Sequence, residues 1–376
     1  MKTLELKTRL LCEGANAMDD ETVEALSDQN PQKVLRGGLS SGLKAKIISQ
    51  EDQLFRRKDL KKEYKVNFPL YSKIPTALKL QTTENGLVIL ENDEVIGSAE
   101  VITPPDWYGQ EVEGYPITSI LTQHGDQLVG SVYEWCSLFN TGEQCKFCVI
   151  DRSQKVPELR KITRKAELIM KALEKIPRGS YQGIGLNGGM TFTEGRGLET
   201  MIPLVRRIRE ALGNIPIGVE ITPPQDPAFI EQYAEAGGES LMMNLETWDD
   251  EIRQKLIPGK SKYCSKDSYF KAFEATVKIL GKGKVSTCFV VGTEPMDSLK
   301  QGIEKVVDFD VIPSPLAGRY FEQFADYPFD PRVNWKDFLE IFRFTREQML
   351  QRGLMSSDKA GCISCGMCDV IGDKEQ

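Results

Sequence analysis

The chain has 376 residues, of which 40% are hydrophobic and 27% are charged, and its formal net charge is −7. This length can hold one large barrel with additions or two ordinary domains. The acidic balance argues against a nucleic-acid partner, because binding a phosphate backbone needs a surplus of Lys and Arg. The sequence shows neither an apolar run of the ~18 residues that cross a bilayer nor a signal peptide, so we expect a cytoplasmic protein with no membrane contact.

Residues 1–127 predict an N-terminal appendage of mixed α and β structure. Within it, residues 87–102 read as two strands joined by an acidic turn, and Pro104 and Pro105 end the pattern.

From residue 128 the chain alternates short apolar runs with helical patterns. Strands are predicted at 128–135, 181–186, 215–221, 240–245, 285–291 and 309–312, and helices at 158–176, 201–212, 227–236, 269–280, 297–307 and 335–351. Alternation of this kind predicts a parallel sheet with right-handed crossovers. The expected fold class is therefore α/β, with a partial (βα)6 TIM-type barrel over 128–352 and a C-terminal tail over 353–376.

Three cysteines, Cys136, Cys145 and Cys148, follow the first predicted barrel strand. Thiols this close, in a chain without a secretory signal, predict soft metal ligands rather than disulfides. Three ligands for a cubane of four irons leave one iron open to a small molecule. A structural zinc site completed by His124, Cys264 or Cys288 is the alternative, and scattered core cysteines are another.

The aromatic residue Phe147 precedes the last of these cysteines, and this Cys-x-aromatic-Cys ending after a first strand resembles the cluster loop of radical S-adenosylmethionine (radical SAM) enzymes. The first spacing here is eight residues where three is common. Together with His124-Gly-Asp126, Pro258-Gly-Lys260 and the chain's terminal cysteines, it resembles a biotin synthase-like group of that superfamily.

This resemblance implies a 4Fe-4S cluster that binds S-adenosylmethionine and cleaves it to a 5′-deoxyadenosyl radical, which takes hydrogen from an unactivated carbon. It also implies a reducing partner such as ferredoxin or flavodoxin.

The resemblance further implies cofactor contacts at the ends of the barrel strands. Gly188 and Gly189 would meet the methionine amino group, although Met190 follows where Glu is common. The other implied contacts are Phe147, Glu220, Asn244 and Glu246, with Glu294 as a further candidate. The alternatives are a tight turn for the glycine pair and capping or turn roles for the polar residues.

A second triplet, Cys362, Cys365 and Cys368, matches the first part of a bacterial ferredoxin run and predicts a second 4Fe-4S cluster, with structural zinc as the alternative. Two clusters in a small barrel resemble lipoyl synthase, which implies a sulfurtransferase that inserts sulfur into an octanoyl chain on an acylated carrier protein. Dehydrogenation or rearrangement of a small metabolite, with the second cluster as electron acceptor or substrate anchor, is the alternative. A non-catalytic electron carrier is a third hypothesis, and a second radical SAM protein is a further candidate partner.

Overall fold

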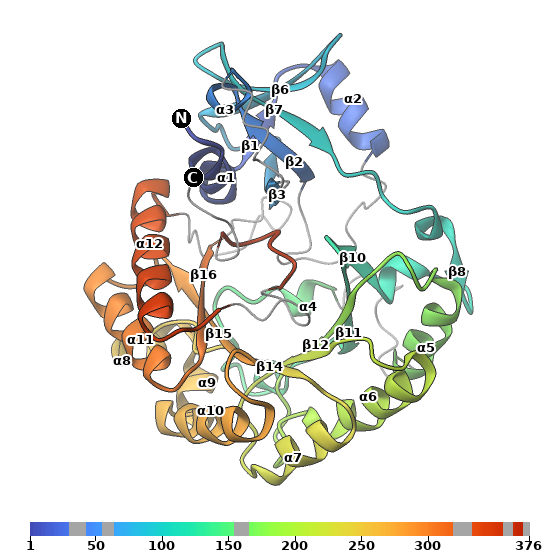
Figure 1. Ribbon diagram of the computed structural model, residues 1–376, viewed down its shortest axis with the longest axis vertical. Helices are drawn as coiled ribbons and strands as arrows, with labels where there is room; N and C mark the ends of the chain where they lie inside the picture. The colour runs from blue at the N-terminus through green and yellow to red at the C-terminus, as the bar shows by residue number, and fades with distance from the viewer. Residues whose placement is uncertain (30–42, 55–63, 154–164, 319–332, 356–363, 371–376) are drawn as a thin grey trace.

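The computed structural model describes residues 1–29, 43–54, 64–153, 165–318, 333–355 and 364–370. Two seven-stranded sheets dominate it, one in the N-terminal unit (residues 1–102) and one in the barrel (Figure 1).

The barrel sheet has the strand order β10-β11-β12-β13-β14-β15-β16, and β11 to β16 run parallel. Its strands are β10 (Thr122–His124), β11 (Gln127–Tyr133), β12 (Gly183–Gly188), β13 (Ile217–Ile221), β14 (Ser240–Met243), β15 (Val285–Val291) and β16 (Ile312–Ala317). The six parallel strands confirm the predicted partial (βα)6 barrel. The antiparallel edge strand β10 was not predicted; it pairs with β11.

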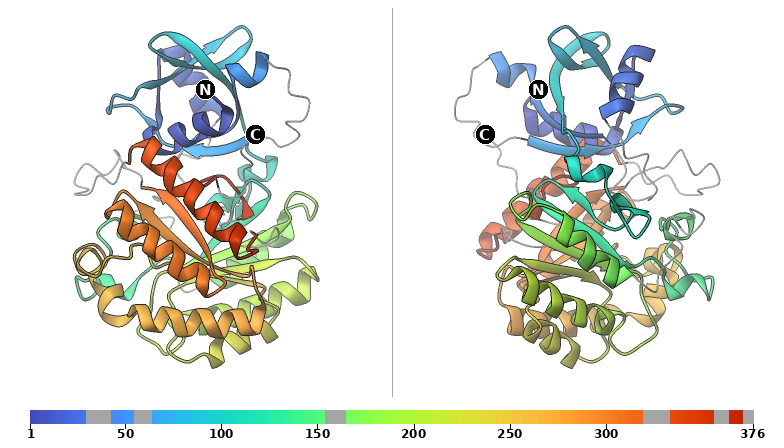
Figure 2. Two further views of the ribbon diagram at one scale, coloured as in Figure 1. Left: turned by 60° about the vertical axis from the view of Figure 1, so that its left-hand side comes forward. Right: turned by 90° about the vertical axis from the view of Figure 1, so that its right-hand side faces the viewer.

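Helices cover the outer face of this curved sheet (Figure 2). They are α5 (Lys165–Lys175), α6 (Leu198–Leu212), α7 (Ala228–Glu235), α10 (Lys266–Leu280), α11 (Met296–Asp308) and α12 (Trp335–Gln351). The short helices α4 (Ile150–Ser153), α8 (Asp250–Leu256) and α9 (Pro258–Tyr263) lie in the connections that follow strands. In α6, for example, Met201, Val205 and Ile208 recur at helical spacing and are buried against the strands. The short helices α8 and α9 were not predicted.

The last barrel strand lies further along the chain than predicted. The strand predicted at 309–312 was placed too early in the chain. Helix α11 runs to Asp308, and Asp310 turns the chain with a positive φ of 58°. The strand instead spans Ile312–Ala317 and contains Pro313 and Pro315. Proline cannot donate to a sheet ladder, and β16 accommodates two of them because, among the described residues, it is an edge strand that pairs with β15 alone.

The N-terminal unit has the strand order β3-β2-β7-β6-β5-β1-β4. Its elements are α1 (Thr3–Glu13), β1 (Ala15–Ala17), α2 (Asp20–Gln29), β2 (Leu43–Ser49), α3 (Gln50–Leu54), β3 (Tyr64–Phe68), β4 (Leu70–Tyr71), β5 (Leu78–Thr83), β6 (Gly86–Glu91) and β7 (Glu94–Val101). The hairpin β6–β7 confirms the predicted strand pair, and its two turn residues, Asn92 and Asp93, both have positive φ, as a tight hairpin requires.

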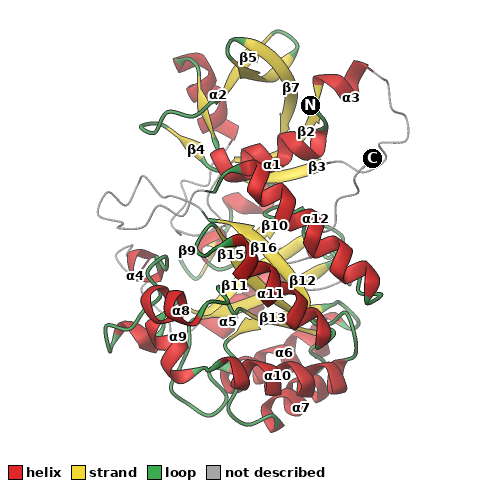
Figure 3. Ribbon diagram, turned by 90° about the vertical axis from the view of Figure 1, so that its left-hand side faces the viewer, coloured by secondary structure: helices red, strands yellow, loops and turns green. Residues whose placement is uncertain are grey.

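A connecting segment joins the two sheets. It contains the 3₁₀ turns η1 (Asp106–Gly109) and η2 (Ile117–Ser119) and a small ribbon of β8 (Glu111–Val112) and β9 (Tyr115–Pro116). Helix α1 packs against α12, so the N-terminal unit lies directly on the barrel's last helix (Figure 3). The domain boundaries at 127 and 352 stay a prediction.

Candidate active site

The first cysteine loop begins where β11 ends. Cys136 is followed by the 3₁₀ turn η3 (Ser137–Phe139), and the Ser137 backbone N–H donates to the Met190 carbonyl at 2.7 Å. A Cβ on Gly189 would lie 2.1 Å from the Trp135 carbonyl oxygen and 2.6 Å from the Cys136 Cβ. A side chain at position 189 would therefore collide with the cysteine loop, which passes directly over Gly189. A turn with positive φ is not the reason, since neither glycine of the pair adopts one.

Gly188 has a similar packing reason, because a Cβ there would lie 2.6 Å from the Tyr133 ring. The glycine pair thus lets β11 and the cysteine loop approach the end of β12 closely.

The three thiols of this loop lie close enough to influence one another. Burial raises the pKa of Cys145, and the charges of Cys148 and Cys136 raise it further. Burial likewise raises the pKa of Cys148 to about 12. In the part of the chain that the structure describes, no three His, Cys, Asp or Glu side chains converge as ligands of one metal ion. A cubane makes a different demand, because each thiolate binds its own iron. Three neighbouring soft ligands therefore fit a cluster.

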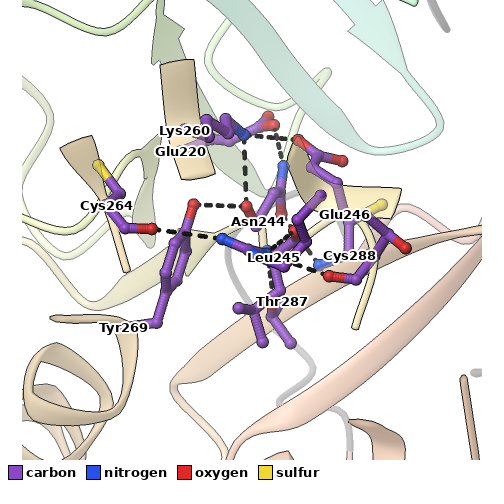
Figure 4. A network of polar contacts seen from close by, with 11 residues as sticks. Glu220, Asn244, Leu245, Glu246, Lys260, Cys264, Tyr269, Thr287 and Cys288 are labelled. Carbon is purple, nitrogen blue, oxygen red and sulfur yellow. Dashed lines mark hydrogen bonds and ion pairs between the residues drawn. The ribbon is translucent and has the colours of Figure 1, made fainter. Parts of the chain in front are cut away.

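A polar network lies at the carboxyl ends of the next strands (Figure 4). The Asn244 side-chain amide donates to Glu220 Oε1 at 2.6 Å, and its oxygen accepts the Cys288 backbone N–H at 3.0 Å. Lys260 Nζ donates to Glu246 Oε1 at 2.6 Å and lies 3.3 Å from the Asn244 carbonyl oxygen. Three of the sequence-predicted contacts, Glu220, Asn244 and Glu246, therefore share one network, and Lys260 joins it.

The backbone of Glu246 is held in an unusual conformation. Its φ is 69°, in the left-handed region that residues with a Cβ seldom adopt. Its N–H donates to the Cys288 carbonyl at 2.9 Å and its carbonyl accepts the Val290 N–H at 2.8 Å. The buried guanidinium of Arg253 donates to the carbonyls on both sides, those of Leu245 at 2.8 Å and Thr247 at 3.1 Å. These contacts overdetermine the strained residue, a pattern typical of functional sites.

The network contains two carboxyl groups, those of Glu220 and Glu246, and one ammonium group, that of Lys260. Burial works to lower the pKa of Lys260, but the Glu246 carboxylate, with Tyr269 and Cys145, holds that pKa well above its ordinary value. Burial and the Glu246 charge raise the pKa of Glu220. Lys260 and Glu246 therefore form a charged pair, beside which Glu220 is driven toward its neutral form.

Helices α8 and α9 join this network to the cysteine loop. The Gly259 N–H donates to the Glu143 carbonyl at 2.9 Å, and the Lys146 N–H donates to the Leu256 carbonyl at 2.8 Å. A Cβ on Gly259 would lie 2.6 Å from the same Glu143 oxygen. Lys260 therefore lies beside the cysteine loop as well as Glu246. Sequence analysis did not select Lys260 as a site residue, although Pro258-Gly-Lys260 contains the helix-starting proline and the close-packing glycine that position it.

The other two predicted contacts, Phe147 and Glu294, lie outside the polar network. Phe147 packs beside Cys145 with Leu256 and Ile257. The Glu294 carboxylate accepts the backbone N–H groups of Trp248 and Asp249 at 2.7 and 2.8 Å, so it caps the start of α8 and is not part of the network.

The terminal cysteines lie at the opposite end of β11. The Cys365 carbonyl oxygen is 3.1 Å from the position of a Cβ on Gly125, in the turn before β11 begins, whereas Cys136 follows the end of that strand. Cys368 packs with Met242 and Cys288. Cys362 lies outside the described residues.

The parallel half barrel and the thiol loop at the end of its first strand define an α/β protein in which three thiols lie beside a polar network. Residues 131–306 match the family model described as the Radical SAM superfamily. The chain therefore carries a radical SAM domain, and enzymes of this superfamily use a 4Fe-4S cluster and S-adenosylmethionine.

The chain is also similar to the bacteriochlorophyllide c C-7(1)-hydroxylase of Chlorobaculum limnaeum, with 25% identity over 260 residues. The similarity covers 64% of this chain and 65% of that protein, which is less than two thirds of the relative's length.

Two solved structures show weaker likeness. One is a radical SAM methyltransferase from Sphaerobacter thermophilus, with a TM-score of 0.45 and 16% identity over 76% of each chain. The other is the coproporphyrinogen III oxidase of Escherichia coli, with a TM-score of 0.41 and 15% identity over 63% of this chain and 55% of that one. Among the described residues, no helix has the length and apolar character needed to cross a membrane.

Proposed function

We propose that this chain is a radical SAM enzyme that activates an unactivated C–H bond. The observation that carries the proposal is the position of three neighbouring thiols beside the Glu246–Lys260 pair, at the carboxyl end of a barrel of this superfamily. Cys136, Cys145 and Cys148 would hold the cluster. When bound, the cluster and S-adenosylmethionine supply an electron transfer that cleaves a C–S bond, giving methionine and a 5′-deoxyadenosyl radical that abstracts hydrogen.

The chain's own residues would bind and orient the cofactor. An ammonium such as Lys260 is the natural partner of a carboxylate, and the oxygens of Glu220, Asn244 and Glu246 are natural acceptors for ammonium and hydroxyl groups. Gly188 and Gly189 would allow the cysteine loop to lie close to the end of β12, and Phe147 would offer a flat apolar face. Because the network lies at the end of the barrel, these residues would also keep water away from the reacting groups.

Reductive cleavage tests this proposal. The anaerobically reconstituted protein, reduced with dithionite and given S-adenosylmethionine, should form 5′-deoxyadenosine, and a variant with Cys136, Cys145 and Cys148 changed to Ala should form none. Enzymes of this superfamily typically need a reducing partner such as ferredoxin or flavodoxin, so flavodoxin should replace dithionite. A reduced, cluster-bearing protein that forms no 5′-deoxyadenosine would favour the electron-carrier hypothesis instead.

The terminal triplet of Cys362, Cys365 and Cys368 would hold a second 4Fe-4S cluster, which we call the auxiliary cluster. The chemistry of the auxiliary cluster would distinguish two subtypes of the proposed enzyme, one that inserts sulfur and one that does not. Sulfur insertion is favoured by the packing of Cys368 against Met242 and Cys288, because these side chains share the inner face of the sheet with Asn244. An auxiliary cluster there could reach a substrate radical in the barrel.

The competing subtype uses the auxiliary cluster as an electron acceptor or a substrate anchor, for dehydrogenation or rearrangement of a small metabolite. The similar protein from Chlorobaculum limnaeum is named as a C-7(1)-hydroxylase, and hydroxylation of a carbon also breaks a carbon–hydrogen bond. Loss of acid-labile sulfide with each turnover, in the presence of an octanoylated carrier protein, would support sulfur insertion. Turnover with the sulfide count unchanged would support the competing subtype.

A further inference from the structure

The described part of the terminal tail, residues 364–370, lies against the N-terminal unit as well as the barrel. It runs between β16 and β10 (Figure 1). The Asn67 backbone N–H, on β3, donates to the Met367 carbonyl at 2.7 Å. The N-terminal unit therefore contacts the turn that carries Cys365 and Cys368.

One lysine of the N-terminal unit donates to this turn, and a second donates to a neighbouring segment. Lys7, on α1, has no solvent-exposed surface, and its Nζ donates to the Gly366 carbonyl at 2.7 Å. Lys44, on β2, donates from Nζ to the Gln123 carbonyl at 2.9 Å. Gln123 is two residues from Gly125, against which the Cys365 carbonyl packs. Lys7 therefore donates to the backbone between Cys365 and Cys368, and Lys44 donates beside the turn against which the Cys365 carbonyl packs.

The electrostatic effects agree with this geometry. Burial lowers the pKa of Lys44 to about 8, and the charges of Cys368 and Cys365 oppose that change. Lys44 is thus within reach of the fields of Cys365 and Cys368.

Burying a cation is costly unless a negative charge compensates it. A thiolate-ligated iron–sulfur group is such a charge, and groups around a cluster tune its potential through their own charge.

We propose that the N-terminal unit is one wall of the auxiliary metal site, in which Lys7 and Lys44 act as positioning residues that oppose the negative charge of an iron–sulfur group bound by Cys365 and Cys368. This inference rests on the proposed auxiliary cluster. Reduction adds negative charge to the cluster, so the two ammonium groups favour the reduced form and raise its midpoint potential. The N-terminal unit thereby sets the potential of a cluster whose ligands lie about 320 to 360 residues away in the sequence.

The test is a potentiometric titration of the full-length, reconstituted protein followed by electron paramagnetic resonance. The variants are K44M and K7M, with K46M as the matched control, because Lys46 lies on the same strand and pairs with the exposed Glu100 at 3.7 Å. K44M and K7M should shift the auxiliary midpoint to more negative potential and leave that of the first cluster unchanged. K46M should shift neither, and K44R should restore the wild-type value.

A structural role would give a different result. If Lys44 only supported the fold, K44M would lower the thermal stability of the metal-free protein and leave the auxiliary potential unchanged, and that pair of results would overturn the inference. If K7M does not fold, K44M decides the question.

An iron count shows separately whether the auxiliary cluster exists. About four irons in the wild type, unchanged when Cys362, Cys365 and Cys368 become Ala, would remove both the auxiliary cluster and this inference. Formation of 5′-deoxyadenosine by the same protein would still support the first cluster and the radical SAM activity.

Discussion

The Lys260 ammonium lies 2.6 Å from the Glu246 carboxylate, on a helix that is bonded through its backbone to the cysteine loop. Side-chain exposures of 14% for Lys260 and 9% for Glu246 show that the pair is largely removed from water. One ion pair therefore joins the strand-end network to the loop that carries the first three thiols.

We expect loss of the Lys260 charge to impair cofactor cleavage. K260M should reduce the rate of 5′-deoxyadenosine formation by on the order of 100-fold, because a preorganised charge beside the cofactor would be lost. The matched control is K262M on the same helix, since the exposed Lys262 pairs with Glu143 at 2.7 Å and surface pairs contribute at most about 1 kcal/mol. A K260M rate within about threefold of wild type, less than 1 kcal/mol in the barrier, would exclude Lys260 from cofactor binding.

The Glu246–Lys260 pair should also be visible in the stability of the metal-free protein. E246Q and K260M should each lower the free energy of unfolding by about 3–5 kcal/mol, because each leaves a buried charge without its partner. The double variant should lose much less than the sum, since it buries no lone charge. Urea unfolding of the three variants measures this coupling energy, and strictly additive losses would contradict the pairing.

The raised pKa of Glu220 predicts a pH-dependent stability. The unfolded state ionises near the ordinary glutamate pKa of about 4.3, whereas the folded state retains the proton to higher pH. The contribution of Glu220 is therefore fully present below that ordinary value and is lost as the pH rises through the folded pKa. The stability of E220Q relative to wild type should increase over that window in urea unfolding of the metal-free protein. A difference that is independent of pH would show that the pKa of Glu220 is the same in the folded and unfolded states.

The close approach at Gly189 predicts a selective effect on the first cluster. G189A would place a methyl group 2.1 Å from the Trp135 carbonyl, so the start of the cysteine loop must shift and cluster iron should be lost. G185A on the same strand is the control, because its Cβ would meet its nearest neighbour, a methyl group of Val129, at 3.7 Å, an ordinary contact. Equal iron contents in the two variants would show that the loop tolerates the displacement.

Sequence periodicity predicted the barrel well because a parallel sheet buries both faces of its strands. The run at 285–291 is β15 without change, and the helix at 335–351 is α12. The last strand could not be found in the same way, since Pro313 and Pro315 argue against a strand unless its edge position is already known. The mixed topology of the N-terminal sheet depends on non-local pairings, such as β1 between β4 and β5, that local patterns do not encode.

The candidate site was predictable where chemistry follows a strand end. Glu220, Asn244 and Glu246 were selected for that reason, and the structure brings them into one network. Lys260 was not selected because it lies on the short helix α9, which returns to the sheet only through tertiary packing. The contact of Lys7 with the terminal turn could likewise not be predicted, since it joins opposite ends of the chain.

The most direct test combines an anaerobic iron and acid-labile sulfide count, Mössbauer spectra and a single turnover with S-adenosylmethionine. Wild type should hold about eight irons, and changing Cys362, Cys365 and Cys368 to Ala should leave about four with 5′-deoxyadenosine still formed. Changing Cys136, Cys145 and Cys148 to Ala should abolish its formation. If the reduced wild type carries its first cluster and forms no 5′-deoxyadenosine, or if the first-triplet variant still forms it, the proposed radical chemistry at this loop is wrong.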